Sequence, residues 1–171
     1  KLLFCRVVMY NFKAVEEEIL SYWEKNKLYL KVKDKNKGKK KFYYLDGPPY
    51  TSGRIHLGHA WGKALRDSVM RYKRMNGFDV WDRSGFDMHG LPTEHAVEKK
   101  LGIKDKTEIE KFGVLNYVKE CEKLSVENLK LMISDFKRLG VWMDWDNSYM
   151  PINTSYIEGV WWLVKKAHEK G

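Results

Sequence analysis

Cysteine and long apolar runs are both scarce in this sequence. The two cysteines, Cys5 and Cys121, are too far apart to form a close-spaced metal or redox motif, and they fit reduced thiols in a cytosolic protein. No apolar run approaches the roughly 20 residues that span a bilayer. The opening KLLFCRVVM is short and interrupted by Arg6, so it is a poor signal peptide, and Met9 is a candidate natural start. We therefore expect a cytoplasmic protein without a membrane partner.

Acidic residues are fewer than basic ones. The 171 residues contain 23 Asp and Glu against 32 Lys and Arg, which leaves a formal net charge of +9. Much of this excess lies in KVKDKNKGKKK, residues 31–41, where seven lysines and one aspartate leave a net charge of +6. Two interpretations stay open for this segment: a solvated loop, or a contact with a nucleic-acid backbone. The length suits one domain with a sizeable core.

Hydrophobic periodicity predicts an α/β fold. Apolar residues recur at helical spacing over residues 12–23, 60–75, 129–139 and 156–170. In the second of these helices the recurring residues are Trp61, Leu65, Val69 and Tyr72, and Asn76-Gly77 ends the helix. The runs FYYLD, residues 42–46, and FDVWDRSG, residues 78–85, predict strands. Strand, glycine-rich turn, helix and strand make a βαβ unit, which implies a parallel sheet with a right-handed crossover.

The turn GPPYTSGRIHLGH, residues 47–59, joins the first strand to the helix and is the main candidate site. Ligands bind outside the carboxyl ends of parallel strands, and a helix N-terminus attracts anions. His56 and His59 can project from one face of the first helical turn, where imidazole donors suit a phosphate whose charge changes during reaction. Gly53 and Gly58 permit close approach of the backbone to a ligand. The turn contains neither a Walker loop nor a Gly-x-Gly-x-x-Gly fingerprint, and an incidental His-x-x-His remains the alternative.

A second candidate site residue follows the second strand. Asp87, in GFDMHG, can face the same crevice, where a carboxylate suits the α-ammonium of an amino acid. The alternative is a turn aspartate that caps its own loop. His89 has three interpretations: it orients Asp87, it contacts substrate, or it only packs.

Beyond these motifs, the residues resemble a known family. HLGH is similar to the His-x-Gly-His signature of class I aminoacyl-tRNA synthetases. The wider stretches DGPPYTSGRIHLGH, RYKRMNGFDV and GFDMHGLPTEHAVEKKLGI resemble the isoleucyl-tRNA synthetases, and so does NFKAVEEEILSYWEKNKLY. The resemblance covers residues 11–171. The Lys-Met-Ser-Lys-Ser loop of that family is absent from the sequence. We therefore expect an N-terminal fragment that ends near the editing-domain insertion.

The resemblance implies a fold and a domain division. Residues 1–41 are expected to form an N-terminal helix and a lysine-rich linker. Residues 42–171 are expected to form the first half of the Rossmann-like nucleotide-binding catalytic domain, with parallel strands and helices.

The resemblance also implies an activity, in which isoleucine is activated by ATP and ligated to tRNA(Ile). His56 and His59 would be catalytic, and with Gly58 and Thr51 they would bind ATP. Gly47, Pro48, Asp87 and His89 would bind the amino acid. The signature motif comprises Pro49, Tyr50, Thr51, Ser52, Gly53, Arg54, Ile55, His56, Leu57, Gly58 and His59. ATP would arrive with Mg²⁺, and no protein-bound metal is expected in this fragment. The full-length enzyme is expected to be a monomer, and the fragment alone to be weakly active and to self-associate.

Other functions stay open. The valyl and leucyl synthetases share the two-histidine signature, and small nucleotidyltransferases share the tetrapeptide. A metal hydrolase is a further alternative, because His56, His59, His89 and His95 lie within 40 residues, with Asp87 and Glu94 nearby. A non-enzymatic role would be to bind nucleotide or to pack against a second half.

Overall fold

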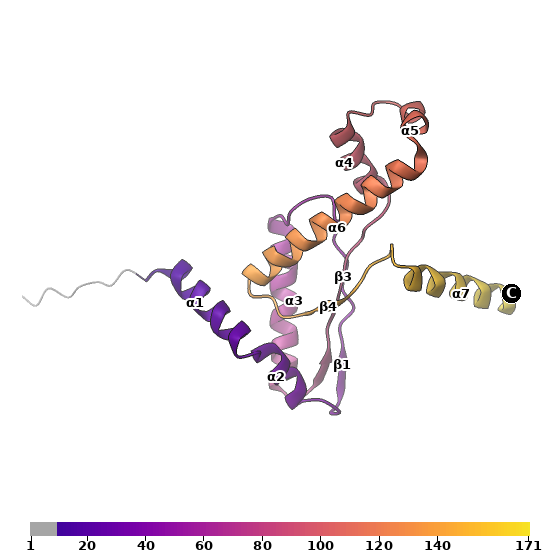
Figure 1. The fold of residues 1–171 in the computed structure, drawn as a ribbon. Coiled ribbons are helices and arrows are strands. Elements are labelled where there is room, and N and C mark those ends of the chain that lie inside the picture. The colour runs from indigo at the N-terminus through magenta and orange to yellow at the C-terminus, as the bar shows by residue number, and fades with distance from the viewer. Residues whose placement is uncertain (1–9) are drawn as a thin grey trace, which may run out of the picture.

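The structure is a computed structural model that describes residues 10–171 (Figure 1). Cys5 and the segment around the candidate start Met9 lie outside the described residues. The described helices are α1 (Phe12–Lys25), α2 (Leu28–Lys35), α3 (Leu57–Met75), α4 (Leu91–Leu101), α5 (Lys106–Phe112), α6 (Val114–Arg138) and α7 (Thr154–Lys170), and the strands are β1 (Lys41–Tyr43), β2 (Asp79–Trp81), β3 (Arg83–Gly85) and β4 (Asp144–Tyr149). None of these helices has the length and apolar character needed to cross a membrane.

The predicted βαβ unit is confirmed. β1 pairs in parallel with β2, with Phe42 opposite Val80, and α3 connects the two strands. After β2, the chain continues through Asp82 into β3, which pairs in parallel with β4. The strands are shorter than predicted, because β1 ends at Tyr43 and the second predicted strand is divided into β2 and β3 at Asp82. The predicted α/β class therefore holds, with three-residue strands in the first unit.

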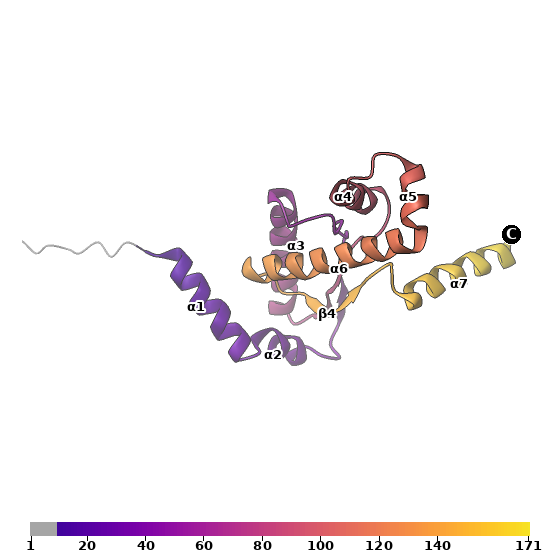
Figure 2. The same ribbon diagram turned by 45° about the horizontal axis from the view of Figure 1, so that its top comes forward.

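The core lies between the strands and helix α6. Its fully buried residues include Phe86, Met132 and Phe136, and the predicted stripe of α6 supplies most of one side. Figures 1 and 2 show α6 crossing over the strands and α3. Leu139, the last member of the predicted stripe, is half exposed because α6 ends at Arg138.

Helix α3 turns its apolar stripe outward. Trp61 is 68% exposed and Leu65 59% exposed, whereas the buried residues of α3 are Lys63, Asp67, Met70 and Arg74. The charged members of this buried face are paired. Asp67 accepts hydrogen bonds from the Trp142 N–H, at 3.1 Å, and from Arg71, at 2.7 Å. The helix predicted from apolar spacing exists, but it is anchored by its polar face.

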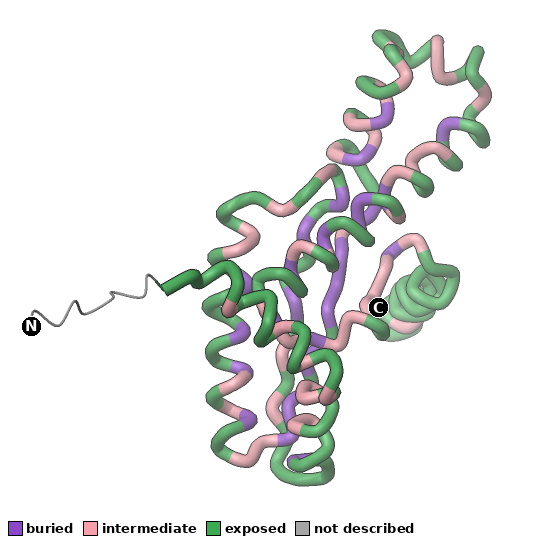
Figure 3. Tube along the Cα trace, turned by 60° about the vertical axis from the view of Figure 1, so that its left-hand side comes forward, coloured by how far each residue is buried: buried purple, intermediate pink, exposed green. Residues whose placement is uncertain are grey.

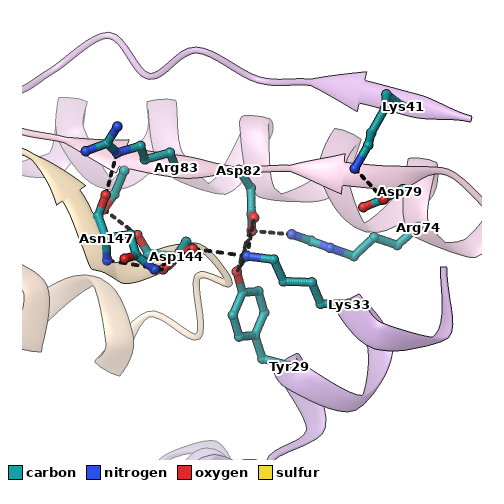
Figure 4. A network of polar contacts seen from close by, with 10 residues as sticks. Tyr29, Lys33, Lys41, Arg74, Asp79, Asp82, Arg83, Asp144 and Asn147 are labelled. Carbon is teal, nitrogen blue, oxygen red and sulfur yellow. Dashed lines mark hydrogen bonds and ion pairs between the residues drawn. The ribbon is translucent and has the colours of Figure 1, made fainter. Parts of the chain in front are cut away.

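The lysine-rich segment is not a plain loop. Its first half belongs to α2, where Tyr29 and Lys33 reach the break between β2 and β3 (Figure 4). The Tyr29 hydroxyl donates to Asp82 at 3.0 Å, and the Lys33 ammonium lies 3.1 Å from Asp144. Arg74 pairs with the same Asp82. At least part of the basic excess therefore attaches α2 to the strands rather than remaining free for a polyanion.

Helices α1 and α7 extend away from the central body on opposite sides (Figures 1 and 2). Both helices are exposed along most of their length (Figure 3). On α7, Trp161 is 69% exposed and Trp162 61% exposed. Near the end of α1, Trp23 packs edge-on against Trp142 with ring centroids 5.1 Å apart.

Candidate active site

The first turn of α3 is closed by its two histidines. His56 is the N-cap residue, and its Nδ1 accepts the backbone N–H groups of Gly58 at 3.1 Å and His59 at 3.4 Å. In return, Nδ1 of His59 accepts the N–H of His56 at 3.4 Å. The two rings stack with centroids 3.7 Å apart. The spacing of three therefore forms a capping box in which imidazoles replace the usual Ser and Glu.

This capping fixes the chemistry of both rings. A ring nitrogen that accepts a backbone N–H carries no proton, so each neutral imidazole holds its proton on Nε2. Burial lowers the pKa of His59, and its proximity to the His56 ring and to the Lys63 ammonium lowers it further. His59 therefore stays neutral at pH 7 and presents an Nε2–H donor beside a helix N-terminus.

Gly58 makes room for the cap. A Cβ at this position would lie 3.0 Å from Cε1 and 3.2 Å from Nδ1 of the His56 ring. Nothing lies within 4 Å of a Cβ built on Gly53, so the structure shows no comparable crowding there. The absence of a side chain at Gly58 therefore leaves room for the His56 ring that caps the helix.

A pocket of about 270 Å³ lies beside the histidine turn. The predicted residues Gly47, Pro48, Pro49, Tyr50, Gly58 and His59 line it, together with Gly62, Lys63, Arg66 and Phe136. The loop that follows β1 and the first turns of α3 therefore form one concave surface. This surface brings Gly58 and His59 of the predicted ATP site together with Gly47 and Pro48 of the predicted amino-acid site, whereas His56, Asp87 and His89 are not among its lining residues.

Asp87 is joined directly to the proline loop. Its N–H donates to the carbonyl of Pro49 at 2.8 Å, and its carbonyl accepts the N–H of Thr51 at 2.9 Å. One carboxylate oxygen, Oδ1, is buried and accepts no hydrogen bond within residues 10–171. Nδ1 of the exposed His89 lies 3.7 Å from this oxygen, beyond hydrogen-bond distance. A buried carboxylate oxygen in this state suits a cationic ligand.

Thr51 and Arg54 connect segments of the fold. Thr51 is completely buried, its hydroxyl donates to the Asp87 carbonyl at 3.3 Å, and its own carbonyl accepts the Asn128 amide at 2.9 Å. Arg54 pairs with Asp135 of α6 at 2.5 Å. The predicted contact between Thr51 and ATP gains no support from this placement, because Thr51 is not among the residues that line the pocket.

The pocket also contains residues that the motif did not single out. Lys63 and Arg66 follow His59 by four and seven residues, so helical spacing places them on its side of α3. Asp46, the residue before Gly47, pairs with Lys63 and lies 3.8 Å from Arg66. The sequence could have indicated Lys63 and Arg66, because they are charged residues one and two helical turns after His59.

The four histidines of the metal-site alternative do not converge. His56 and His59 stack on each other, whereas His95 pairs with Glu98 of its own helix at 3.1 Å. Within residues 10–171 no three His, Cys, Asp or Glu side chains gather in an arrangement that could hold a metal ion.

Gly85 yields a stability prediction. A Cβ on Gly85 would lie 2.0 Å from the ring of Tyr149, whose hydroxyl donates to the Asp46 carbonyl at 3.0 Å. We expect Gly85→Ala to lower the free energy of unfolding by about 1–3 kcal/mol, as overpacking does, in urea denaturation followed by circular dichroism. Gly62→Ala is the control, because its Cβ would meet nothing within 4 Å and alanine favours the helix by about 0.5–1 kcal/mol. Equal stability of the two variants would contradict the close packing of Tyr149 on Gly85.

Comparison with known proteins identifies related sequences. The family described as tRNA synthetases class I (I, L, M and V) matches residues 18–171. The chain is 51% identical over 162 residues to the isoleucine–tRNA ligase of Methanocaldococcus jannaschii, which covers 94% of this chain and 16% of that protein. It is 52% identical over 163 residues to the isoleucine–tRNA ligase of Pyrococcus horikoshii, covering 95% of this chain and 15% of that protein. The chain thus spans about a sixth of the length of these relatives.

A solved structure has a similar fold. The crystal structure of a ternary complex of Agrobacterium radiobacter K84 agnB2 LeuRS with tRNA and LeuAMS superposes with a TM-score of 0.70 at 24% sequence identity. The match covers 95% of this chain and 18% of that chain. The predicted α/β fold of a class I synthetase is therefore confirmed.

Proposed function

We propose, from the premise that this chain belongs to the family of class I tRNA synthetases (I, L, M and V), that it carries the first half of an active site for isoleucine. The reaction would be the ATP-dependent activation of isoleucine and its ligation to tRNA(Ile) in the cytoplasm, with Mg²⁺ accompanying ATP. About 50% identity to isoleucine–tRNA ligases supports isoleucine over valine or leucine. The proposed enzyme is a monomer whose remaining active-site residues lie outside these 171.

The domain division follows from this proposal. Residues 42–171 would form the first half of the nucleotide-binding catalytic domain, and residues 1–41 would precede it. The strand pairs and α3 support the assignment because they bring the histidine turn, the proline loop and Asp87 together.

The histidine turn is the observation that carries the proposal. In the first step, the isoleucine carboxylate would attack the α-phosphorus of ATP, and the bond to pyrophosphate would break as the acyl-adenylate forms. Such a reaction needs positioning and charge stabilisation rather than a covalent catalyst. His56 and His59, with their protons on Nε2, would donate to the phosphates most strongly in the transition state. In the second step, a tRNA 3′ hydroxyl would take the acyl group and AMP would leave.

The amino acid would bind between the proline loop, which lines the pocket, and Asp87, which is bonded to Pro49. Asp87 would pair with the α-ammonium through its buried Oδ1. Gly47 and Pro48, which line the pocket, would border the side chain, and His89, 3.7 Å from Oδ1, would lie beside Asp87. Because Asp87 is bonded through its backbone to Pro49 and Thr51, the ammonium and side-chain contacts would share one rigid segment.

The proposed function is tested in a chimera with a full-length relative. In a chimera, the matched 162 residues of the M. jannaschii isoleucine–tRNA ligase are replaced by those of this chain. ATP–pyrophosphate exchange is measured with isoleucine, valine and leucine in parallel. We expect exchange to be fastest with isoleucine. A higher rate with valine or leucine would favour the alternative synthetases, and no exchange with any of them would contradict the proposed function.

Asp87 gives a second prediction. Asp87→Asn in this chimera should weaken isoleucine binding about 10- to 100-fold, because a hydrogen bond to a charged group is worth about 1.5–3 kcal/mol. ATP affinity should remain nearly unchanged, as measured by calorimetry with each substrate separately. Asp34→Asn, an exposed acid in α2, is the control. Equal weakening of both substrates would mean that the change disturbs the fold instead.

A further inference from the structure

The carboxylate of Asp46 connects the three segments that carry the proposed site. Asp46 is buried, with 3% of its surface exposed. Its Oδ1 accepts the Tyr44 hydroxyl at 2.9 Å, and its Oδ2 accepts the Gly85 N–H at 3.2 Å and the Lys63 ammonium. Asp46 directly precedes the Gly47-Pro48 loop, and Gly85 stands two residues before Asp87.

Lys63 is buried one turn below His59. Its ammonium lies 3.7 Å from the Met143 sulfur and 5.3 Å from the centroid of the Phe136 ring, and 3% of the residue is exposed. A buried ammonium in such surroundings is costly unless an anion pairs with it. Arg66 lies 3.8 Å from the same carboxylate, but its side chain is 44% exposed. Asp46 and Lys63 therefore form the buried pair.

We propose that Asp46 and Lys63 are positioning residues that hold the histidine turn, the proline loop and Asp87 in one fixed arrangement. The inference rests on the proposed function. Asp46 directly precedes the proline loop, so its position determines where that loop begins. Its Oδ2 accepts the N–H of Gly85, on the strand that leads to Asp87. The same oxygen pairs with Lys63, which lies on the helix that follows His56 and includes His59. ATP and isoleucine react only if these segments keep their relative positions, and a misplacement of about 1 Å can cost 10²-fold in rate.

A purely structural role is the alternative. Apolar residues of similar volume often stabilise a fold as well as a buried ion pair does, so stability alone does not require this pair. The structure offers a matched control on the same helix. Arg74 pairs there with Asp82, which lies between β2 and β3, and the two side chains are 2% and 0% exposed. Arg74 lies eleven residues along α3 from Lys63, about 16 Å away along the helix axis.

The experiment compares Asp46→Asn with Asp82→Asn in the chimera described above, with rates expressed per folded active site. Both variants should melt at a lower temperature, because each leaves a buried cation without its anion. Asp46→Asn should lower kcat of pyrophosphate exchange about 10- to 100-fold, with KM for ATP and isoleucine within about threefold of the wild type. Asp82→Asn should keep kcat within about threefold.

A double variant separates stability from positioning. Asp46→Asn with Lys63→Met removes both charges and places an apolar chain beside Met143 and Phe136. We expect its melting temperature to recover toward the wild type while kcat stays low. Wild-type kcat in either Asp46 variant, or an equal loss of kcat in Asp82→Asn, would overturn the inference while leaving the proposed function intact. A wild-type chimera without exchange would instead overturn the proposed function and this inference with it.

Discussion

Replacing His59 by asparagine in the chimera should lower kcat of isoleucine-dependent pyrophosphate exchange by about 10²–10³, with little change in KM. Removal of one donor aimed at developing charge has a cost of that size in other enzymes. An effect on kcat without an effect on KM means that the interaction forms in the transition state and not in the ground state. The measurement is exchange kinetics at varied ATP and isoleucine.

Asparagine is chosen because the structure separates two roles of this ring. Nδ1 of His59 accepts the backbone N–H of His56, and Nε2 carries the proton that would meet phosphate. Asparagine still supplies an oxygen near the position of Nδ1, so the capping box can survive while the Nε2–H is lost. The His59 variant should therefore melt within a few degrees of the wild type.

His95→Asn is the control for this substitution. His95 is exposed on α4 and pairs only with Glu98 among the described residues, at 3.1 Å, so its loss should leave both kinetic parameters unchanged. A loss confined to KM in His59→Asn would contradict the transition-state role. A large fall in melting temperature would show instead that His59 acts mainly as the helix cap.

The sequence predicted helices with regular apolar spacing, but it did not predict α2, α4, α5 or β4 or show which side of α3 is buried. The C-terminal part of α6, from Leu129, was predicted because its apolar residues face the core, and spacing detects such a helix. α3 has equally regular apolar residues, yet Trp61 and Leu65 face outward. Its buried face is held by Asp67, Arg74 and Lys63, and ion pairs between residues far apart in sequence leave no periodic signal. Apolar spacing therefore finds the helix without showing which side is buried.

The candidate site was predicted where local rules determine the geometry. A strand, a glycine-rich turn and a helix start place His56 and His59 together, and the strand ends place Asp87 beside Pro49. The tautomer of the histidines and the role of Asp46 depend on partners that only the folded chain brings close. Thr51 belongs to the signature motif, but the motif does not indicate that Thr51 is buried and bonded to the Asp87 carbonyl.

The 171-residue chain by itself should exchange pyrophosphate at least about 10³-fold more slowly than the chimera, and it should self-associate. Within residues 10–171 the pocket is lined by the proline loop, the first turns of α3 and Phe136 of α6, and Lys63 and Arg66 are the cationic side chains of this lining. Much of the electrostatic stabilisation of a triphosphate would then be missing, and the loss of single donors already costs about 10²–10³. Exchange by the chain and the chimera at equal concentrations measures the first part of this prediction.

Self-association is expected from the outward apolar residues. Trp61, Leu65 and Val69 on α3 are 50–68% exposed, and α7 exposes Trp161 and Trp162 at 69% and 61%. Contiguous apolar surface of this kind drives association in water, at about 25 cal/mol for each Å² that a second copy covers. Sedimentation velocity of the chain over a range of concentrations should therefore show oligomers.

Leu65→Glu should raise the monomer fraction, whereas Ser68→Glu, an exposed polar position on the same helix, should change it little. A monomeric chain that exchanges pyrophosphate near the rate of the chimera would contradict both parts, because it would mean that these 171 residues need no other surface to cover their apolar faces or to complete the reaction.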